Sequence, residues 1–493
     1  MSTSNTARER WALVGWAALA LGVRLAAIPR ALGDVDGVNF ARALTRFDPL
    51  AQAPHLPGYP VYVLCARLFA ALGAPEVWAL ALPGVLASVA GILVLFAAVA
   101  RHFGPRPAHL TAAALTALPG AVLAAGWPTS DGLGLGLLCV TLGLAGLAAP
   151  TPAARPRPVL AASAGLALGL LMGVRLSAWP LVAGAAPLLA AAALRRPQLR
   201  PAALAAAGGA ALGLLAWAVP MALLVPPATL LSQGAAFAQG HFTDFGGAAP
   251  SADALPARLL TMLWGLVAAT LGASWPAEPL AEPAALGVLA LAAVAVGVIV
   301  RGPRRLTPPL VGALAVLGGY LVWVWLGQNV DKPRHLLPVV PALALGLGLA
   351  LARTRVPALL VAAVLLAVSV PRAMTQGGLP PAAELVRHVI RSHPPEGVQI
   401  FAGEEARLFE RYAPAHRVWR VTDPAVLARE TAAAAARGAT VLVVSGAAGW
   451  PALQAELTEE ARFATPRTVQ AHDPELVLYR FQPSPERLLH ATR

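Results

Sequence analysis

The chain has 493 residues, of which 57% are hydrophobic and only 12% are charged. Soluble proteins average about 45–50% apolar and about 25% charged residues. This composition, with a mean hydropathy of +0.66, excludes a water-soluble protein. The net charge of +13 does not indicate nucleic-acid binding, because Lys332 is the only lysine and the arginines form no stripe with aromatic residues. We therefore expect a multi-span protein surrounded by membrane lipids, with no nucleic-acid partner.

Apolar stretches of spanning length, about 17–25 residues, recur until about residue 370. The first follows Arg8 and Arg10 and is longer than a signal-peptide core, so we interpret it as a retained span. The stretches 58–73 and 259–275 are shorter and ambiguous. The predicted spans are 11–29, 77–100, 108–126, 133–150, 159–174, 177–193, 202–225, 284–300, 309–327, 335–352 and 356–371.

The connections between these spans alternate in charge, which predicts their sides of the membrane. Five carry arginine and no acid, and the others carry the acids. Because basic residues concentrate in short cytoplasmic loops, we expect the arginine connections inside. This alternation holds only if both short stretches lie against or dip into the outer leaflet, which leaves about eleven spans. If both cross, the count is about thirteen and the middle loops change sides. Either count places the N-terminus in the cytoplasm of a cell and the C-terminal segment outside its membrane.

Residues 373–493 differ from the apolar part, 1–372, because they contain most of the glutamates and many arginines. β-rich runs at 398–401, 418–421, 440–445 and 476–481 alternate with helix-like segments at 382–391, 404–412, 425–437 and 451–459. This alternation predicts a small extracytoplasmic α/β domain with a largely parallel sheet. No catalytic spacing occurs in it, and we expect it to bind acceptor or to be structural.

The first outer loop, residues 30–57, is the strongest candidate for chemistry. Asp34 and Asp36 follow a span directly, and such carboxylates can accept a proton from an attacking hydroxyl or bind a divalent cation. Phe40, Leu44 and Phe47 have helical spacing, which predicts an amphipathic helix on the bilayer. The alternative is that acids in an outer loop merely follow the charge asymmetry.

The motif Asp36-x-x-Asn-Phe-Ala, then Phe-Asp-Pro at 47–49 and Pro-His-Leu-Pro-Gly-Tyr-Pro-x-Tyr at 54–62, resembles the first loop of GT-C membrane glycosyltransferases. More narrowly, it is similar to family 39-type proteins related to protein O-mannosyltransferases and the aminoarabinose transferase. The resemblance implies a catalytic acid in this loop, carried onto Asp36 with Asp34 as second choice. It also implies a polyprenyl-phosphate sugar donor. His55 and Tyr59 fall in its substrate-binding element, although Leu56 replaces a proline there.

Two further positions could belong to the same site. The resemblance implies a second acid at Asp131, at the outer end of a span, and the alternative is a helix N-cap. Arg175 interrupts an apolar run of more than thirty residues. It is interpreted as a ligand of the donor phosphate, or else as an anchor that reaches the membrane surface.

The polar loop 328–335 contains Lys332, Arg334 and His335, followed by a Leu-Leu-Pro-x-x-Pro stretch that resembles this superfamily. Such a cluster can neutralise a phosphate leaving group, and headgroup anchoring is the alternative. In the long outer loop 226–258, His241 with Asp244 is a weaker candidate for substrate or metal binding.

Together these observations predict an inverting glycosyltransferase of GT-C fold. It would move a hexosyl or pentosyl unit from a polyprenyl phosphate to a lipid, glycan or protein hydroxyl on the extracytoplasmic side. No ATP-binding motif occurs. The only cofactor that the sequence suggests is a divalent cation, bound by Asp34 and Asp36. The alternative is a lipid or polysaccharide transporter or flippase, which predicts ionisable groups near the membrane midplane and pseudo-symmetric halves.

Overall fold

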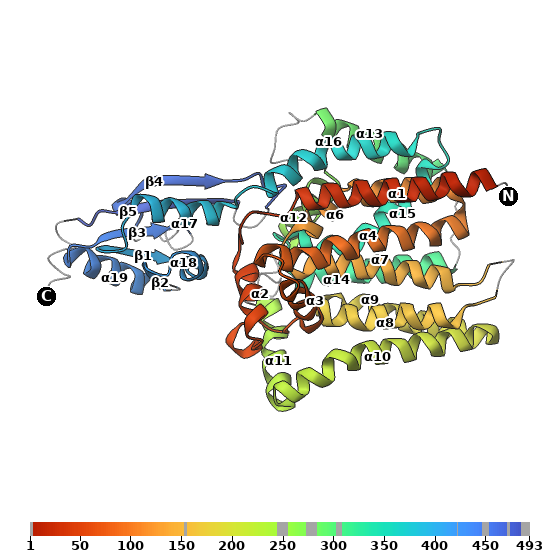
Figure 1. Cartoon of the computed structure of the whole chain (residues 1–493), viewed down its shortest axis with the longest axis horizontal. Coiled ribbons are helices and arrows are strands. Elements are labelled where there is room, and N and C mark those ends of the chain that lie inside the picture. Colours follow the sequence, from red (N-terminus) through yellow and green to blue (C-terminus); the bar gives the residue numbers. More distant parts are fainter. Residues whose placement is uncertain are drawn as a thin grey trace.

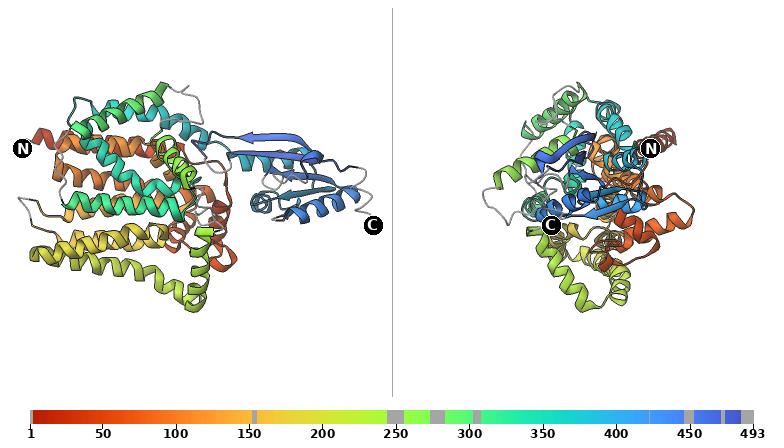
Figure 2. Two further views of the ribbon diagram at one scale, coloured as in Figure 1. Left: turned by 180° about the vertical axis from the view of Figure 1, so that it is seen from behind. Right: turned by 90° about the vertical axis from the view of Figure 1, so that its left-hand side faces the viewer.

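A bundle of long helices carries a small β-sheet at one end, and the N-terminus lies at the opposite end (Figure 1). The two further views agree on this arrangement (Figure 2). This computed structural model describes residues 3–151, 155–243, 255–272, 283–301, 308–421, 423–445, 453–470 and 474–484. The helices of the bundle and of the loops at its end are α1 (Thr3–Ala26), α2 (Val35–Thr45), η1 (Pro49–Ala51), α3 (Pro60–Ala71), α4 (Glu76–Phe103), α5 (Pro105–Ala117), α6 (Pro119–Gly126), α7 (Ser130–Ala148), α8 (Pro158–Val174), η2 (Leu176–Ala178), α9 (Trp179–Arg195), η3 (Pro197–Leu199), α10 (Arg200–Leu224), α11 (Pro227–Thr243), α12 (Leu255–Trp264), the π-helical η5 (Gly265–Thr270), α13 (Pro283–Arg301), α14 (Pro308–Gly327), η6 (Pro333–Val339), α15 (Val340–Leu351) and α16 (Ala358–Gln376).

Every stretch predicted as a span is helical. Among the described residues, six helical segments are long and apolar enough to cross a membrane, and the bent pair α5–α6 makes seven. Among the described residues, five more apolar helical segments have 10–17 residues, including the whole of α8 and parts of α13 and α14. The 17 residues of α8 rise about 26 Å, slightly less than the roughly 30 Å of hydrocarbon. The chain is a multi-pass membrane protein.

Small residues let two helix pairs approach closely. α4 packs along α7, and α8 packs along α10. A Cβ added at Gly136 of α7 would overlap the backbone at Ala87 of α4, and one at Gly209 of α10 would overlap the carbonyl of Ala162. Such contacts replace the hydrophobic driving force that is missing between helices in lipid.

A buried arginine stabilises the 53° bend between α5 and α6. Pro119 has no N–H, so the carbonyl of Leu115 loses its helical donor. Arg24 of α1 donates to Leu115 O at 2.8 Å and to Thr116 O at 3.1 Å. Its Nε donates to Ser88 Oγ at 2.8 Å. Arg24 is fully buried, and the sequence did not single it out.

The C-terminal sheet is mixed rather than largely parallel. Strands β2, β1 and β3 are parallel, while β5 is antiparallel to β3 and pairs with the edge strand β4, in the order β2-β1-β3-β5-β4. The prediction of a helix at 451–459 is wrong for residues 457–459, which begin β4, because pairing with β5 outweighs local helix propensity. The elements are α17 (Pro381–Ser392), β1 (Val398–Ala402), α18 (Ala406–Tyr412), β2 (Arg417–Arg420), α19 (Pro424–Ala436), β3 (Thr440–Val444), η7 (Gln454–Glu456), β4 (Leu457–Ala464) and β5 (Glu475–Phe481).

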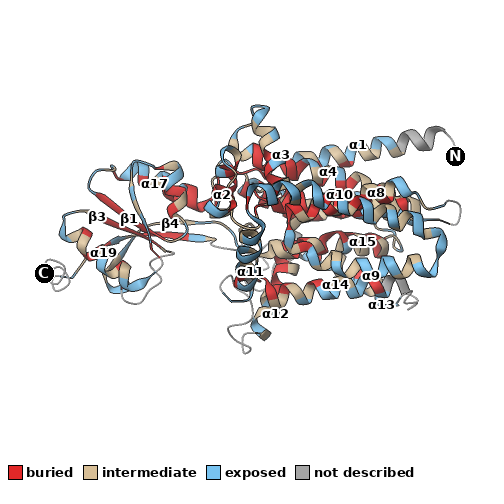
Figure 3. Ribbon diagram, turned by 90° about the horizontal axis from the view of Figure 1, so that it is seen from below, coloured by how far each residue is buried: buried red, intermediate tan, exposed pale blue. Residues whose placement is uncertain are grey.

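The sheet domain is anchored on the first loop by a shared core. Phe40 and Val38 of α2 belong to one buried cluster with Leu408 and Phe409 of α18. Figure 3 shows buried residues in the bundle, in α2 and in α17. The Tyr412 hydroxyl accepts from the amide of Leu32 at 2.9 Å. The predicted helix of the first loop therefore forms, but protein covers its apolar face where we expected the bilayer.

Candidate functional site

The two acids of the first loop have different surroundings. Asp34 is the N-cap of α2: Oδ1 accepts from the amide of Gly37 at 2.6 Å, and Oδ2 accepts from Nε1 of Trp127 at 3.0 Å. Asp36 lies in the first turn of α2. Its Oδ2 accepts from Arg334 at 2.8 Å, and its Oδ1 lies 3.7 Å from Nδ1 of His55. Asp34 therefore holds the helix in place, while Asp36 faces the basic residues.

The same surroundings separate the acidities of the two carboxyls. Burial raises the pKa of Asp34, and the charge of Asp36 raises it further. Burial also acts to raise the pKa of Asp36, but the charges of Arg334 and Lys332 hold it well below its usual value. Two carboxyls whose pKa values diverge are typical of sites with distinct acid and base roles. Asp36 is the more acidic of the two.

Arg334 connects the first loop to the second predicted acid. Its Nη2 contacts Asp36, and its Nη1 lies 4.0 Å from Oδ2 of Asp131. Asp131 lies in the first turn of α7 and pairs with Arg175, whose Nη2 donates to Nδ1 of His335 at 3.1 Å. The side chain of Asp131 is 5% exposed and that of Arg175 10%. Asp131 is not the helix N-cap that the alternative made it: Thr129 is the N-cap, and its hydroxyl donates to Asp131.

His55 and Tyr59 form an aromatic wall beside Asp36. Nε2 of His55 lies 3.2 Å from the Tyr59 hydroxyl, and the Phe40 ring packs edge-on to Tyr59 with centroids 5.1 Å apart. Burial lowers the pKa of His55 despite the neighbouring Asp36, so the imidazole is neutral near pH 7. Burial raises the pKa of Tyr59 to about 12, which keeps its hydroxyl protonated.

Most of the predicted site residues thus converge at one end of the bundle, next to the C-terminal domain. Lys332 is close enough to act electrostatically on Asp36. His241 lies in α11, but its side chain and Asp244 are outside the described residues. Three supporting residues were not predicted: Trp127, Thr129 and Tyr320, whose hydroxyl donates to the carbonyl of His335 at 2.8 Å. A polar atom in an apolar stretch was the only signal for them.

The donor set at the first loop does not suit a divalent cation in this arrangement. Both oxygens of Asp34 accept hydrogen bonds from protein groups, and Asp36 already pairs with Arg334. Among the described residues, no group of three potential ligands includes either acid. A cation here would have to displace an arginine, so no step of the chemistry below uses one.

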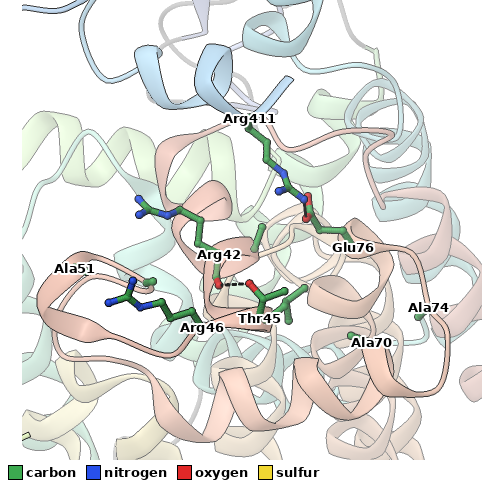
Figure 4. A pocket seen from close by; sticks show the side chains of 11 residues that line it. Arg42, Thr45, Arg46, Ala51, Ala70, Ala74, Glu76 and Arg411 are labelled. Carbon is green, nitrogen blue, oxygen red and sulfur yellow. Dashed lines mark hydrogen bonds and ion pairs between the residues drawn. The ribbon is translucent and has the colours of Figure 1, made fainter. Parts of the chain in front are cut away.

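Two cavities flank α2 and α3. One, of about 410 Å³, lies between α2, the α3–α4 connection and α18, where Arg411 pairs with Glu76 and Arg42 and Arg46 line the wall (Figure 4). It does not contain Asp36, so it is separate from the cluster described above. The other is an apolar notch of about 30 Å³ beside Tyr59, between α3, α8 and α10.

Comparisons with known proteins agree with this architecture. No protein-family model and no curated protein sequence matches the chain. Among solved structures, ArnT from Cupriavidus metallidurans in the apo state aligns with a TM-score of 0.55 and 16% identity over 96% of this chain and 98% of that one. The same protein bound to undecaprenyl phosphate gives a TM-score of 0.54 and 16% identity over 95% and 97%.

A third similar structure is the archaeal oligosaccharyltransferase AglB from Archaeoglobus fulgidus, solved with an inhibitory peptide and a dolichol-phosphate. It aligns with a TM-score of 0.51 and 14% identity over 90% of this chain and 70% of its own. ArnT and AglB are both GT-C proteins. The predicted GT-C-like fold is confirmed, because this chain has the fold of ArnT and AglB.

Proposed function

We propose that the chain transfers a sugar from a polyprenyl-phosphate donor to a hydroxyl group of a lipid, glycan or protein. The observation that carries this proposal is the position of Arg334 between two acids, 2.8 Å from Asp36 and 4.0 Å from Asp131. Glycosyl transfer from a phosphate needs a carboxylate next to cations, and this cluster supplies both. ArnT with undecaprenyl phosphate and AglB with dolichol-phosphate have the same fold.

In the proposed reaction, Arg334 and Arg175 bind the donor phosphate, assisted by Lys332. Guanidinium groups match phosphate oxygens in two-point contacts, and their charge stabilises the polyprenyl phosphate as it leaves. Nε of Arg334 and Nε of Arg175 are buried and have no hydrogen-bond partner in the part of the chain that is described. Both guanidinium groups therefore retain donor capacity.

Asp36 is the proposed general base. It accepts the proton of the acceptor hydroxyl while that oxygen attacks the anomeric carbon and the bond from this carbon to the phosphate oxygen breaks. One displacement inverts the configuration of the anomeric carbon. Asp131 pairs with Arg175 and orients it. His55 and Tyr59 form the wall against which we place the sugar ring.

We place this chemistry on the extracytoplasmic side. The α4–α5 and α15–α16 connections lie together, because Arg106 donates to the carbonyls of Thr354 and Val356. These arginine connections lie at the end far from the sheet (Figure 1), and basic loops are typically cytoplasmic. The site cluster and the C-terminal domain would then lie outside. A flippase is disfavoured, since the polar groups gather at one end of the bundle.

The test incubates purified protein with a panel of radiolabelled polyprenyl-phosphate hexoses and pentoses and with extracted envelope lipids, glycans or proteins. We expect release of free polyprenyl phosphate together with a labelled acceptor, and the anomeric configuration of the product opposite to that of the donor. Asp36→Asn protein from the same preparation is the matched control. Movement of intact donor across vesicles without release of polyprenyl phosphate would instead support the transporter.

A further inference from the structure

A second group of metal-ligating side chains lies in the C-terminal domain, away from the proposed reaction. His388 is on α17, His393 is the C-cap of that helix, and Glu460 is on the edge strand β4. One ligand atom of each lies within 4.8 Å of the other two. The helix and the strand lie side by side (Figure 1).

Hydrogen bonds aim the Glu460 carboxylate at the two imidazoles. Its Oε2 accepts from Nε of Arg480 at 3.1 Å. Its Oε1 lies 2.5 Å from Nε2 of His393 and 3.6 Å from Nε2 of His388. The side chain of His393 is 8% exposed and that of Glu460 17%. A partner that fixes the second oxygen of a ligand in this way is typical of metal sites.

His388 supplies an independent sign that a ligand is needed. Its Nε2 is buried and has no hydrogen-bond partner within the described residues. The ring cannot simply turn away without losing its contact with Phe463, whose centroid is 5.6 Å distant. Native proteins rarely leave such a nitrogen unsatisfied.

We propose that His388, His393 and Glu460 bind one Zn²⁺ ion. Zinc takes imidazole nitrogen and carboxylate oxygen at about 2.0–2.2 Å, which puts the atoms of a tetrahedral set about 3.3 Å apart. The 3.6 Å pair already fits. The 2.5 Å pair is a hydrogen bond that opens by about 0.8 Å when the metal replaces its proton. Water takes the fourth position.

The proposed ion links two elements of the C-terminal domain. It joins the end of α17, the helix that follows α16 out of the bundle, to the edge strand on which Glu460 lies. Ca²⁺ and Mg²⁺ prefer oxygen-only sites, so two imidazoles discriminate against them. This inference does not depend on the proposed function.

The test uses full-length protein in detergent, purified with a tag that contains no histidine and stripped with a chelator. Zn²⁺ content after dialysis and the visible spectrum with Co²⁺ report stoichiometry and geometry. We expect one Zn²⁺ per chain, tetrahedral Co²⁺ bands and a higher unfolding temperature with Zn²⁺ but not with Ca²⁺. His388→Ala should weaken Zn²⁺ binding by more than about 100-fold.

His102→Ala is the matched control, since His102 is exposed on α4, far from the sheet, and its Nε2 contacts only the carbonyl of Gly146 among the described residues. It should retain full stoichiometry. The proposal is overturned if wild-type protein retains no zinc and gives no tetrahedral Co²⁺ bands, or if His388→Ala binds Zn²⁺ as tightly as wild type. The wild-type spectra decide the matter even if the variant does not fold.

Discussion

The substitution Asp36→Asn separates the proposed chemistry from the architecture of the site. Asparagine keeps the size of the side chain, and its amide oxygen can still accept the hydrogen bond that Arg334 donates at 2.8 Å. Exchanging a charge-assisted for a neutral hydrogen bond costs about 1 kcal/mol of folding free energy. Loss of a general base costs about 10²–10⁴-fold in rate, equal to about 2.7–5.4 kcal/mol of transition-state stabilisation. Activity should therefore fall far more than stability.

The assay compares initial rates of polyprenyl phosphate release with thermal unfolding in the same detergent. Asp331→Asn is the control, because Asp331 lies three residues before Arg334 but is exposed. It removes one negative charge from the same face of the protein and should leave the rate within about twofold. A rate for Asp36→Asn within tenfold of wild type refutes Asp36 as the base. So does a rate loss that follows the fraction unfolded.

Three more predictions concern charge and packing. Arg334→Gln should raise the pKa of Asp36, because it removes the charge with the largest effect in lowering that pKa. The acid limb of the pH profile of the residual kcat/KM should therefore move to higher pH, and an unchanged limb contradicts the coupling between the two residues. Gly209→Ala should destabilise the protein by about 1–3 kcal/mol, measured by chemical unfolding, whereas Gly208→Ala should not, since its Cβ would meet nothing within 4 Å. Arg24→Leu should cost about 1–3 kcal/mol for each carbonyl left without a donor in the same measurement, and unchanged stability contradicts its role at the bend.

The helices of the bundle and the first loop were predictable because their signals are local. Apolar runs mark spanning helices wherever they occur, and Asp36 was found from a motif of contiguous residues. The wrong details have a non-local origin: β4 is a strand because β5 lies beside it, and the apolar face of α2 is covered by α18. Neither neighbour can be inferred from the segment itself.

The pairing within the site could not be derived in the same way. Arg334 is 298 residues from Asp36, and Arg175 is 44 residues from Asp131. Arg175 was noticed as a charge in an apolar run and Arg334 as part of a polar loop, but no spacing relates these residues to their acidic partners. Arg24 was overlooked because most of its partners are carbonyl groups, which every residue has. It could be found only from the helix break at Pro119.

The resting geometry implies an order of events for the proposed reaction. A carboxylate whose pKa is held low by Arg334 is ionised but weakly basic, and a base works best with a pKa near the working pH. A donor phosphate that draws Arg334 toward itself removes that charge from Asp36 and raises its pKa. Donor binding would then activate the base, so that the acceptor hydroxyl is deprotonated only when a sugar is in place. Without bound donor, Asp36 would be too weak a base to deprotonate a water molecule.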